Sequence, residues 1–233
     1  MKVRSGTSGF SYKEWKGAFY PEDLAASSML EWYGERLPAV EINNTFYRMP
    51  KPSVVESWAD QVGESFRFVL KASRRITHFK RLKDVEDEVD FFLRSAATLG
   101  EKLGAVLFQL PPNMLKDVDR LEGLLGQLGD PRRAAFEFRH QSWFDPEVAE
   151  CLANHGAALC AADTEERPAE IVPTGPMVYA RLCRPDYDEI QLASWASAVR
   201  NTGRDEGFVF FKHEDEASGP RLAQRFQQLV DGV

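Results

Sequence analysis

Short apolar runs alternate with amphipathic segments along the whole chain, which has 233 residues. This alternation is typical of repeated βα units around a parallel sheet. The apolar runs predict strands at Val3–Ser8, Ala39–Asn43, Phe66–Lys71, Ala105–Leu110, Ala134–Phe138, Ala157–Ala162, Met177–Leu182 and Phe208–Lys212. The amphipathic segments predict helices at Ser27–Leu37, Ser53–Val62, Asp84–Gly100, Val118–Leu128, Pro146–Asn154, Ile190–Asn201 and Pro220–Val230.

Eight strands in this alternation predict an α/β fold of the (β/α)8 TIM-barrel type rather than a doubly wound sheet. The chain is close to the roughly 250 residues of a typical barrel, and no linker, repeat or low-complexity tract divides residues 1–233. We therefore expect one domain. Its sixth βα connection, from Thr164 to Pro176, is expected to be irregular because it is short and rich in proline.

Capping signals mark several helix ends. Ser53 is placed to cap the start of the second helix, because a serine hydroxyl can accept from a free backbone N–H there. Left-handed glycine caps are expected after three helices, at Gly100, Gly129 and Gly156.

Charged residues share one face of several predicted strands. Alternate residues of a barrel strand point inward, and the helix-facing layer cannot cheaply bury charge, so the charged face is expected inside. The inward charged set comprises Arg67, Lys71, Arg139, Arg181, Lys212, Glu41, Glu137 and Asp163. Cations exceed carboxylates in this set, although the chain has a net charge of −7. The excess favours an anionic ligand such as phosphate or carboxylate, and the alternative is a set of structural ion pairs.

Barrel enzymes work at the C-terminal ends of their strands, so the residues after each strand are the candidates for chemistry. Three of the four histidines fall there, at His78, His140 and His213, whereas His155 is expected at the opposite end. In the stretch "VEINNTFYRMP", Glu41 and Asn43 are expected to point into the mouth, and Tyr47 and Arg48 to reach over it. We expect the side chains of the intervening Asn44 and Thr45 to bond to nearby backbone, as is common in tight turns.

Composition places the chain among ordinary folded proteins, with 43% hydrophobic and 28% charged residues. The N-terminus lacks a secretory signal pattern and no apolar run is long enough for a membrane span, so we expect a cytoplasmic protein that does not bind membranes. The thiols of Cys151, Cys160 and Cys183 are expected to be reduced, because they are odd in number and form no CxxC pair. No GxGxxG or P-loop motif indicates a nucleotide cofactor.

Six sequence blocks together resemble the YecE-like proteins, the domain-of-unknown-function 72 (DUF72) family. The blocks are "GTSGFSYKEWKGAFYP", "VEINNTFYRMP", "ITHFKRL", "LFQLPPN", "EFRHQSWF" and "ALCAAD". The resemblance implies a (β/α)8 barrel and no established activity. The chain departs from the family pattern after the seventh strand, where "RLCRPDY" stands in place of a His-Gly pair, and after the eighth, where "FKHEDEASG" replaces an Asn-rich segment. Cys183 is then either a replacement nucleophile or ligand, or a small filler.

The first functional hypothesis is a hydrolase or lyase of a phosphate ester. Arg139, Arg181 and Lys71 would hold the anion, because cationic side chains bind phosphate strongly. The general acid and base would come from Glu41, Glu137 and His140. Further substrate contacts are expected from Asn43, Tyr47, Arg48, His78, Gln109, Trp143 and Asp163. A metal-assisted version, with Zn²⁺ or Mn²⁺ on Glu41, Glu137, Asp163, His78 and His140, ranks lower because the nearby cations would oppose it and no HxH or HExxH spacing is present.

Two other hypotheses remain open. Aromatic and basic residues interleave at "EWKGAFY", "TFYR", "HFKR" and "RHQSWF", which suits recognition of a short single strand, a strand end or a flipped base. Alternatively, the aromatic residues pack the long loops onto the barrel; these are Trp15, Phe19, Tyr20, Phe46 and Trp143. The third hypothesis is a barrel that binds a metabolite without turnover. The sequence does not indicate an oligomeric state.

Overall fold

Eight parallel strands close into a barrel in the computed structural model, which describes residues 1–212 and 217–232. Each strand pairs with the next along the chain, and the last pairs with the first. The strands are β1 (Lys2–Ser8), β2 (Ala39–Ile42), β3 (Arg67–Lys71), β4 (Leu103–Gln109), β5 (Ala134–Glu137), β6 (Ala158–Asp163), β7 (Met177–Leu182) and β8 (Glu206–Phe211). The predicted (β/α)8 barrel is confirmed.

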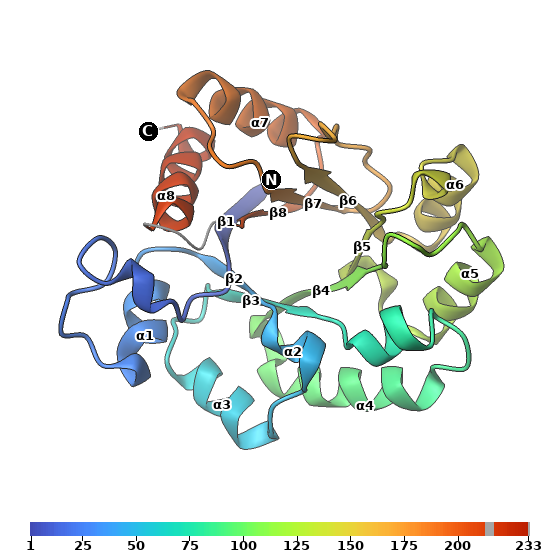
Figure 1. The fold of residues 1–233 in the computed structure, drawn as a ribbon, viewed down its shortest axis with the longest axis horizontal. Coiled ribbons are helices and arrows are strands. Elements are labelled where there is room, and N and C mark those ends of the chain that lie inside the picture. Colours follow the sequence, from blue (N-terminus) through green and yellow to red (C-terminus); the bar gives the residue numbers. More distant parts are fainter. Residues whose placement is uncertain (213–216, 233) are drawn as a thin grey trace.

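Helices form a ring outside the barrel (Figure 1). The α-helices are α1 (Met29–Gly34), α2 (Asn44–Tyr47), α3 (Pro52–Asp60), α4 (Glu86–Ala96), α5 (Val118–Gln127), α6 (Pro146–His155), α7 (Glu189–Asn201) and α8 (Ser218–Asp231). Shorter helical turns are η1 (Lys13–Trp15), η2 (Ala26–Ser28), η3 (Arg75–Phe79), η4 (Ala97–Lys102), η5 (Pro131–Arg133) and η6 (Gln141–Trp143). The sixth connection contains no helix, as expected.

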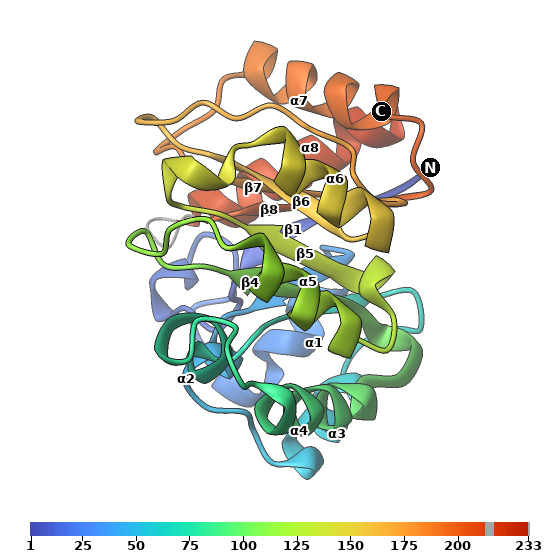
Figure 2. The same cartoon turned by 90° about the vertical axis from the view of Figure 1, so that its right-hand side faces the viewer.

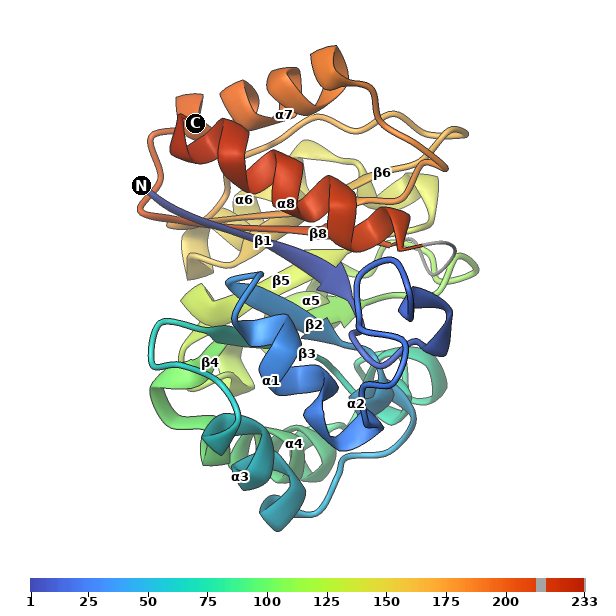
Figure 3. The ribbon, with the colours of Figure 1, turned by 90° about the vertical axis from the view of Figure 1, so that its left-hand side faces the viewer.

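The two side views show which end of the barrel is which (Figures 2 and 3). Both chain termini lie at one end, beside the start of β1, and the short helix α2 lies at the other end. Because α2 follows β2 directly, its end of the barrel holds the C-terminal ends of the strands. We call this end the mouth. Any site built from residues that follow the strands therefore lies away from both termini.

Alternate residues of the strands fill the barrel interior, as expected from the alternation of side chains along a strand. The apolar side chains inside are Ala39, Val69, Ala105, Leu107, Ala135, Ala158, Cys160, Ala162, Met177, Tyr179, Phe208 and Phe210. Continuing each alternation toward the mouth brings Glu41, Lys71, Glu137 and Arg181 inward. Small residues on β6 face large aromatic residues on β7 and β8, which lets the interior fill at native density.

One member of the predicted inward set, Arg67, shares the inward parity of Val69 but lies far from the mouth, and a second member, Asp163, points outward. Arg67 lies at the start of β3, where its Nη1 donates to the carbonyl oxygens of Glu64 and Phe66 at 2.8 Å each. This is the end opposite the mouth. Asp163 follows the inward Ala162 and therefore points outward by the same alternation.

Some helix ends also differ from the prediction. Helix α3 begins one residue before Ser53, with Lys51 as N-cap and Pro52 in the first turn, so Ser53 is not the cap. Gly156 takes the expected left-handed conformation after α6, with φ 71°, and Gly100 also has a positive φ of 54°. Gly129 does not have a positive φ, because α5 ends at Gln127 with an extended Leu128 after it.

Three sequence expectations concern membrane spans, the cysteine thiols and His213. Within the described part of the chain, no helix is both long and apolar enough to cross a bilayer. The three cysteines are free thiols, with Cys151 and Cys160 buried and Cys183 half-buried. His213 lies outside the described residues.

Candidate functional site

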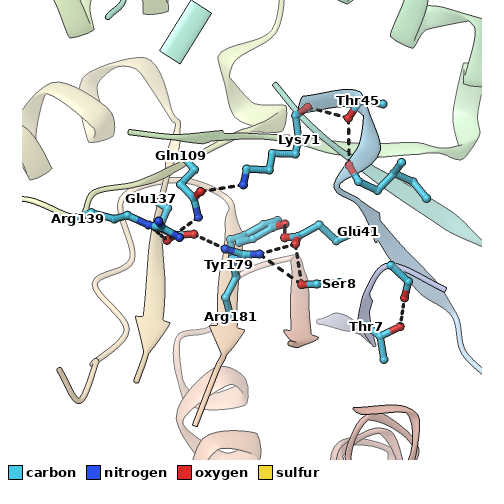
Figure 4. Close-up of polar contacts among 12 residues, drawn as sticks. Thr7, Ser8, Glu41, Thr45, Lys71, Gln109, Glu137, Arg139, Tyr179 and Arg181 are labelled. Atoms are coloured by element: carbon cyan, nitrogen blue, oxygen red, sulfur yellow. Dashed lines mark hydrogen bonds and ion pairs between the residues drawn. The ribbon is translucent and has the colours of Figure 1, made fainter. Parts of the chain in front are cut away.

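Arg181 of β7 lies between two buried carboxylates at the mouth (Figure 4). Its Nη1 donates to Glu137 Oε2 at 2.7 Å and its Nη2 donates to Glu41 Oε1 at 2.8 Å. The three residues are 2%, 3% and 0% exposed in the order Arg181, Glu137 and Glu41. Burial alone would lower the pKa of Arg181, but Glu41 and Glu137 raise it well above its usual value. Arg181 is therefore a permanent cation that neutralises part of the charge of both carboxylates.

Glu41 has donors on both oxygens. Ser8 Oγ donates to Oε1 at 2.7 Å, beside Arg181, and the hydroxyl of Tyr179 donates to Oε2 at 2.6 Å. Burial, and then the nearby Glu41, raise the pKa of Tyr179 well above its usual value, so the phenol keeps its proton and remains a donor. A fully buried carboxylate with three donors fixes the interior, and it is poorly placed to exchange a proton with a substrate.

Glu137 of β5 is equally engaged. Its carboxylate accepts from Gln109 Nε2 at 2.8 Å and from Arg139 Nε at 3.1 Å, in addition to Arg181. Burial alone would raise the pKa of Glu137, but Arg181 and then Arg139 lower it to about 2. At neutral pH this group has no proton to donate and is a very weak base.

Lys71 of β3 contrasts with these paired groups. Its Nζ donates to Gln109 Oε1 at 2.8 Å and lies 4.3 Å from the centre of the Phe46 ring. Among the described residues no carboxylate lies within ion-pair distance of Lys71. Burial, and then Arg181, lower the pKa of Lys71 to about 8, against the opposing effect of Glu41 and Glu137. Lys71 can therefore gain or lose a proton close to neutral pH.

Gln109 connects Lys71 to the charged layer. An ammonium requires an acceptor and a carboxylate requires a donor, so the amide must turn Oε1 toward Lys71 and Nε2 toward Glu137. One hydrogen-bonded chain then runs across five strands, from Lys71 through Gln109 and Glu137 to Arg181, and on to Glu41 (Figure 4). The hydroxyl oxygen of Thr45 lies 2.7 Å from the Lys71 carbonyl oxygen and 3.0 Å from the Ile42 carbonyl oxygen, and its one hydrogen is shared between them, which ties α2 to the end of β3. Thr45 thus bonds to backbone as expected.

His78 and Asn43 lie beside Lys71 at the rim. The His78 ring meets the Phe46 ring edge-on, with centroids 4.8 Å apart, and its Nδ1 pairs with Thr77 Oγ1 at 2.9 Å. Burial, and then Lys71 and Arg139, lower the pKa of His78 to about 4, so its ring is neutral at pH 7. Asn43 Oδ1 is buried and, within the described part of the chain, accepts no hydrogen bond. Such an unpartnered acceptor in a native structure calls for an explanation, and a bound ligand would supply one.

A cavity of about 610 Å³ opens over the Glu137 side of this layer. Its walls are Glu137, Arg139, Gln141, Ala162, Thr164, Glu166, Arg167, Arg181, Cys183 and Lys212. Arginines and lysine outnumber carboxylates there by four to two, and one of the two carboxylates is the fully paired Glu137. The Arg139 side chain is 38% exposed and Lys212 is exposed, so cationic groups face the opening. The cavity is electropositive in a chain of net charge −7.

The sequence from residue 4 to residue 232 matches the family described as "Protein of unknown function DUF72". The chain belongs to the DUF72 family. This confirms the resemblance drawn from the six sequence blocks.

Among relatives of this DUF72 barrel, the UPF0759 protein YunF of Bacillus subtilis is 32% identical over 142 residues, which cover 57% of the chain and 50% of YunF. The UPF0759 protein YecE of Escherichia coli K12 is 32% identical over 128 residues, covering 54% of the chain and 47% of YecE. The chain thus spans about half the length of the curated relatives it matches.

Solved structures of DUF72 proteins share the fold. The structure of a DUF72 protein from Thermotoga maritima superposes with a TM-score of 0.85 at 26% sequence identity. The superposition covers 99% of this chain and 100% of the Thermotoga chain. Another, from Enterococcus faecalis, gives a TM-score of 0.78 at 24% identity, with 99% and 98% covered, and shows likeness of fold alone.

Trp143 and Asp163, two predicted substrate contacts of this DUF72 chain, are instead buried residues that hold the loops in place. Trp143 is 1% exposed, donates from Nε1 to the Met114 carbonyl at 2.8 Å and stacks on Phe138 with centroids 4.5 Å apart. Asp163 is 0% exposed and accepts from the Ala169 N–H at 3.0 Å. The Asp163 carboxylate also accepts from the Tyr187 hydroxyl and from Arg184. It therefore anchors the irregular sixth connection.

Three further candidates lie outside the cavity. His140 Nδ1 accepts from the Ser142 N–H at 3.1 Å and so caps η6, and its side chain does not line the cavity. Tyr47 and Arg48 are exposed and line a separate groove beside α4. The ring that faces Lys71 belongs to their neighbour Phe46.

The residues considered for a metal are not assembled as a ligand set. Arg181 occupies the space between Glu41 and Glu137 where a cation would have to sit, and Asp163 points away from both. Among the described residues no three metal-ligating side chains form a cluster.

Sequence reasoning did not assign several residues to the site, among them Tyr179, Ser8, Phe46 and Arg167. Tyr179 shares the inward parity of Arg181, and Ser8 ends β1, so strand alternation could have indicated both. Phe46 lies on α2, a helix too short for periodicity to reveal. Arg167 lies in the irregular connection, where no pattern predicts side-chain direction.

Proposed function

We propose that the mouth of the barrel binds a small anionic substrate, with a phosphate ester as the class that fits best, and that the protein is an enzyme acting on it. The observation that carries the proposal is the cavity wall, where Arg139, Arg167, Arg181 and Lys212 oppose only Glu137 and Glu166. Since Glu137 already holds three donors, the remaining positive charge has no equal counter-charge in the wall. An anion supplies that counter-charge.

Within this proposal the cations have two different roles. Arg181 is committed through both Nη atoms to Glu41 and Glu137, so it organises the floor of the site. Arg139 donates to Glu137 through Nε and its side chain is 38% exposed, so we assign its Nη groups to the anion, because an arginine fork suits two phosphate oxygens. Lys212 adds a point charge at the end of β8.

Lys71 is the proposed proton carrier; it lies outside the cavity wall but is joined through Gln109 to Glu137, which is part of that wall. With a pKa of about 8 it is mostly an ammonium at pH 7, and it can give its proton to a leaving oxygen in hydrolysis or elimination. Glu41 and Glu137 act in this proposal as positioning residues, because their oxygens are already occupied. The same assignment separates an enzyme from a passive binder, since a binder has no need of a group that titrates near neutrality.

The test uses turnover of a panel of phosphomonoesters, p-nitrophenyl phosphate among them, measured by phosphate release. We expect Lys71→Met to lower kcat by about 10²- to 10⁴-fold, the usual contribution of a general acid, and to change affinity for inorganic phosphate much less. Arg94→Ala, on the exposed face of α4, is the matched control and should keep full turnover. Phosphate binding without turnover of any ester would reject catalysis and leave a binding protein.

A further inference from the structure

Two rim segments beside the mouth concentrate positive charge. Residues 42–55 and residues 71–83 contain no aspartate or glutamate, although the chain has 36 acidic against 29 basic residues. Their lysines and arginines are Arg48, Lys51, Lys71, Arg74, Arg75, Lys80, Arg81 and Lys83. Acidic side chains on distant faces are screened at physiological salt, where the Debye length is about 8 Å. A ligand at this rim therefore meets a cationic surface.

Exposed aromatic rings lie within this cationic surface. Tyr47 on α2 is 65% exposed and Phe79 on η3 is 67% exposed. The Arg74 guanidinium lies 5.5 Å from the Tyr47 ring centre and 5.2 Å from the Phe79 ring centre, so one cation holds rings from two separate loops on the same surface. We call Tyr47, Arg74 and Phe79 the ring platform.

The ring platform is continuous with the mouth. The Phe46 ring meets the Tyr47 ring edge-on at 5.0 Å between centroids, and Lys71 Nζ lies over the Phe46 ring, 4.3 Å from its centre. A groove of about 410 Å³ runs beside Tyr47, with Met49 and Phe91 among its apolar walls. Flat rings, cations and an apolar groove thus occur together at one rim.

The backbone of the second segment is unusual. Helix η3 is a π-helix, a form that occurs often at functional sites. Just after it, Arg81, Leu82 and Asp84 have φ values of 51°, 66° and 51°, although none is glycine. Left-handed conformations of this kind are costly for side chains such as leucine, and they persist where the local geometry is needed. The strain supports a functional rather than a purely structural loop.

We propose that the ring platform and its flanking cations bind single-stranded nucleic acid. Bases would stack on Tyr47 and Phe79, as they do on aromatic side chains in sequence-tolerant single-strand sites. Phosphates would contact Arg48 and Arg75 along the same surface. Asp87 and Glu88 also line the groove beside Tyr47, and Glu88 pairs with Arg75 at 3.5 Å and with Lys80 at 2.8 Å. These two carboxylates offset part of the charge of the eight lysines and arginines in the two rim segments.

A single strand fits better than a duplex or a protein. A duplex hides its base faces and offers the exposed rings nothing to stack on, and the overall net charge of −7 opposes a long duplex. An acidic peptide would use the cations but not two flat rings separated by a guanidinium. The proposal does not rest on catalysis at the mouth, because Tyr47, Arg74 and Phe79 lie outside the cavity wall.

The experiment is fluorescence anisotropy with labelled oligo-dT and oligo-U of about 12 nucleotides, a length within the usual range of single-strand sites. We expect Tyr47→Ala and Phe79→Ala each to weaken binding at least about fivefold, the lower end of the effect of removing one stacked base. Arg48→Ala should also weaken binding and should reduce the slope of log affinity against log salt by about 0.7, the contribution of one phosphate contact on a single strand.

Matched controls come from other faces. Ile190 on α7 is 80% exposed, and Arg221 on α8 has a side chain that is 66% exposed. Ile190→Ala and Arg221→Ala should bind the oligonucleotides like the unmodified chain. All these side chains are at the surface, so the folded state is retained and circular dichroism verifies it.

Three results would overturn the proposal. They are no oligonucleotide binding at low salt, equal weakening by the control variants, or binding that heparin reproduces and that Tyr47→Ala and Phe79→Ala do not change. The last result would identify a plain polyanion contact. Inorganic phosphate binding at the mouth should be unaffected by Tyr47→Ala, so failure of this proposal and failure of the proposed function are distinguishable.

Discussion

Among single residues of the site, three charged side chains are fixed in buried ion pairs, whereas Lys71 can gain or lose a proton near neutral pH. Glu41, Glu137 and Arg181 are buried and hold each other through charge-assisted hydrogen bonds. Among the residues that the structure describes, Lys71 is held by the amide of Gln109 and by contact with Phe46. This division is the reason for assigning proton transfer to a lysine where the sequence favoured Glu41, Glu137 or His140.

Glu137→Gln should change stability in a pH-dependent manner. The pKa of Glu137 in the fold is about 2, below its usual 4.5, so its ionised form is favoured by folding. That stabilisation is complete above pH 4.5 and is lost as the pH falls toward 2. At pH 7 we expect the variant to lose free energy of unfolding on the order of 3 kcal/mol, from about 1.4 kcal/mol per pKa unit.

Urea unfolding at pH 7, 5 and 3.5 checks this prediction. The difference between the original chain and Glu137→Gln should shrink as the pH falls. Glu35→Gln, at a side chain that is 62% exposed, is the control and should change stability by less than about 0.5 kcal/mol at each pH. A difference that stays constant from pH 7 to 3.5 would show that the Glu137 charge does not stabilise the fold.

Strand alternation predicted which residues share the mouth, but it did not predict their partners. Glu41, Lys71, Glu137 and Arg181 were all expected inside, and they are. Which carboxylate pairs with which cation depends on register between strands, and register is not encoded within one strand. Trp143 was misassigned because the direction of a side chain after a strand is decided by tertiary packing against Met114 and Phe138.

At the scale of elements, the regular parts of the chain were predictable and the short ones were not. Each predicted strand overlaps the observed one with ends that differ by at most two residues. Helix α2 and the π-helix η3 were missed, because a single turn carries no periodicity. Both lie at the rim, where they position Phe46 and His78, so the missed elements are those closest to the candidate site.

A pair of glycine substitutions tests the packing of elements. Gly6 lies where β1 meets β2, and a Cβ there would stand 2.0 Å from the Ala39 carbonyl oxygen. Gly123 lies on exposed α5, where a Cβ would meet nothing within 4 Å. We expect Gly6→Ala to destabilise the fold by at least about 2 kcal/mol through overpacking, and Gly123→Ala to stabilise it by about 0.5–1 kcal/mol.

Urea unfolding of Gly6→Ala and Gly123→Ala measures the change in the free energy of unfolding that each substitution causes. Opposite changes in the free energy of unfolding support the close approach of β1 and β2. If Gly6→Ala were neutral, the backbone contact between Gly6 and Ala39 could not be as tight as described, and the position of Ser8 beside Glu41 would need revision.

At the scale of the whole molecule, an acidic protein keeps cations at one end of its barrel. The net charge is −7, yet the cavity wall and both rim segments are positive. Such an arrangement concentrates anions at the mouth, and its effect on binding should weaken as salt is added. Both chain termini lie at the opposite end, so a tag on either one leaves the mouth accessible (Figures 2 and 3).

Anion binding at the barrel mouth can be measured by calorimetric titration of the protein with inorganic phosphate at low ionic strength. Arg139→Ala is the informative variant and Arg94→Ala, whose ion pair with Asp90 is exposed, is its control. We predict that phosphate binds to the original chain and to Arg94→Ala alike, and at least about tenfold more weakly to Arg139→Ala, since a charge-assisted contact contributes about 1.5–3 kcal/mol. Absence of phosphate binding, or equal phosphate affinity in all three proteins, would show that the barrel mouth is not an anion site.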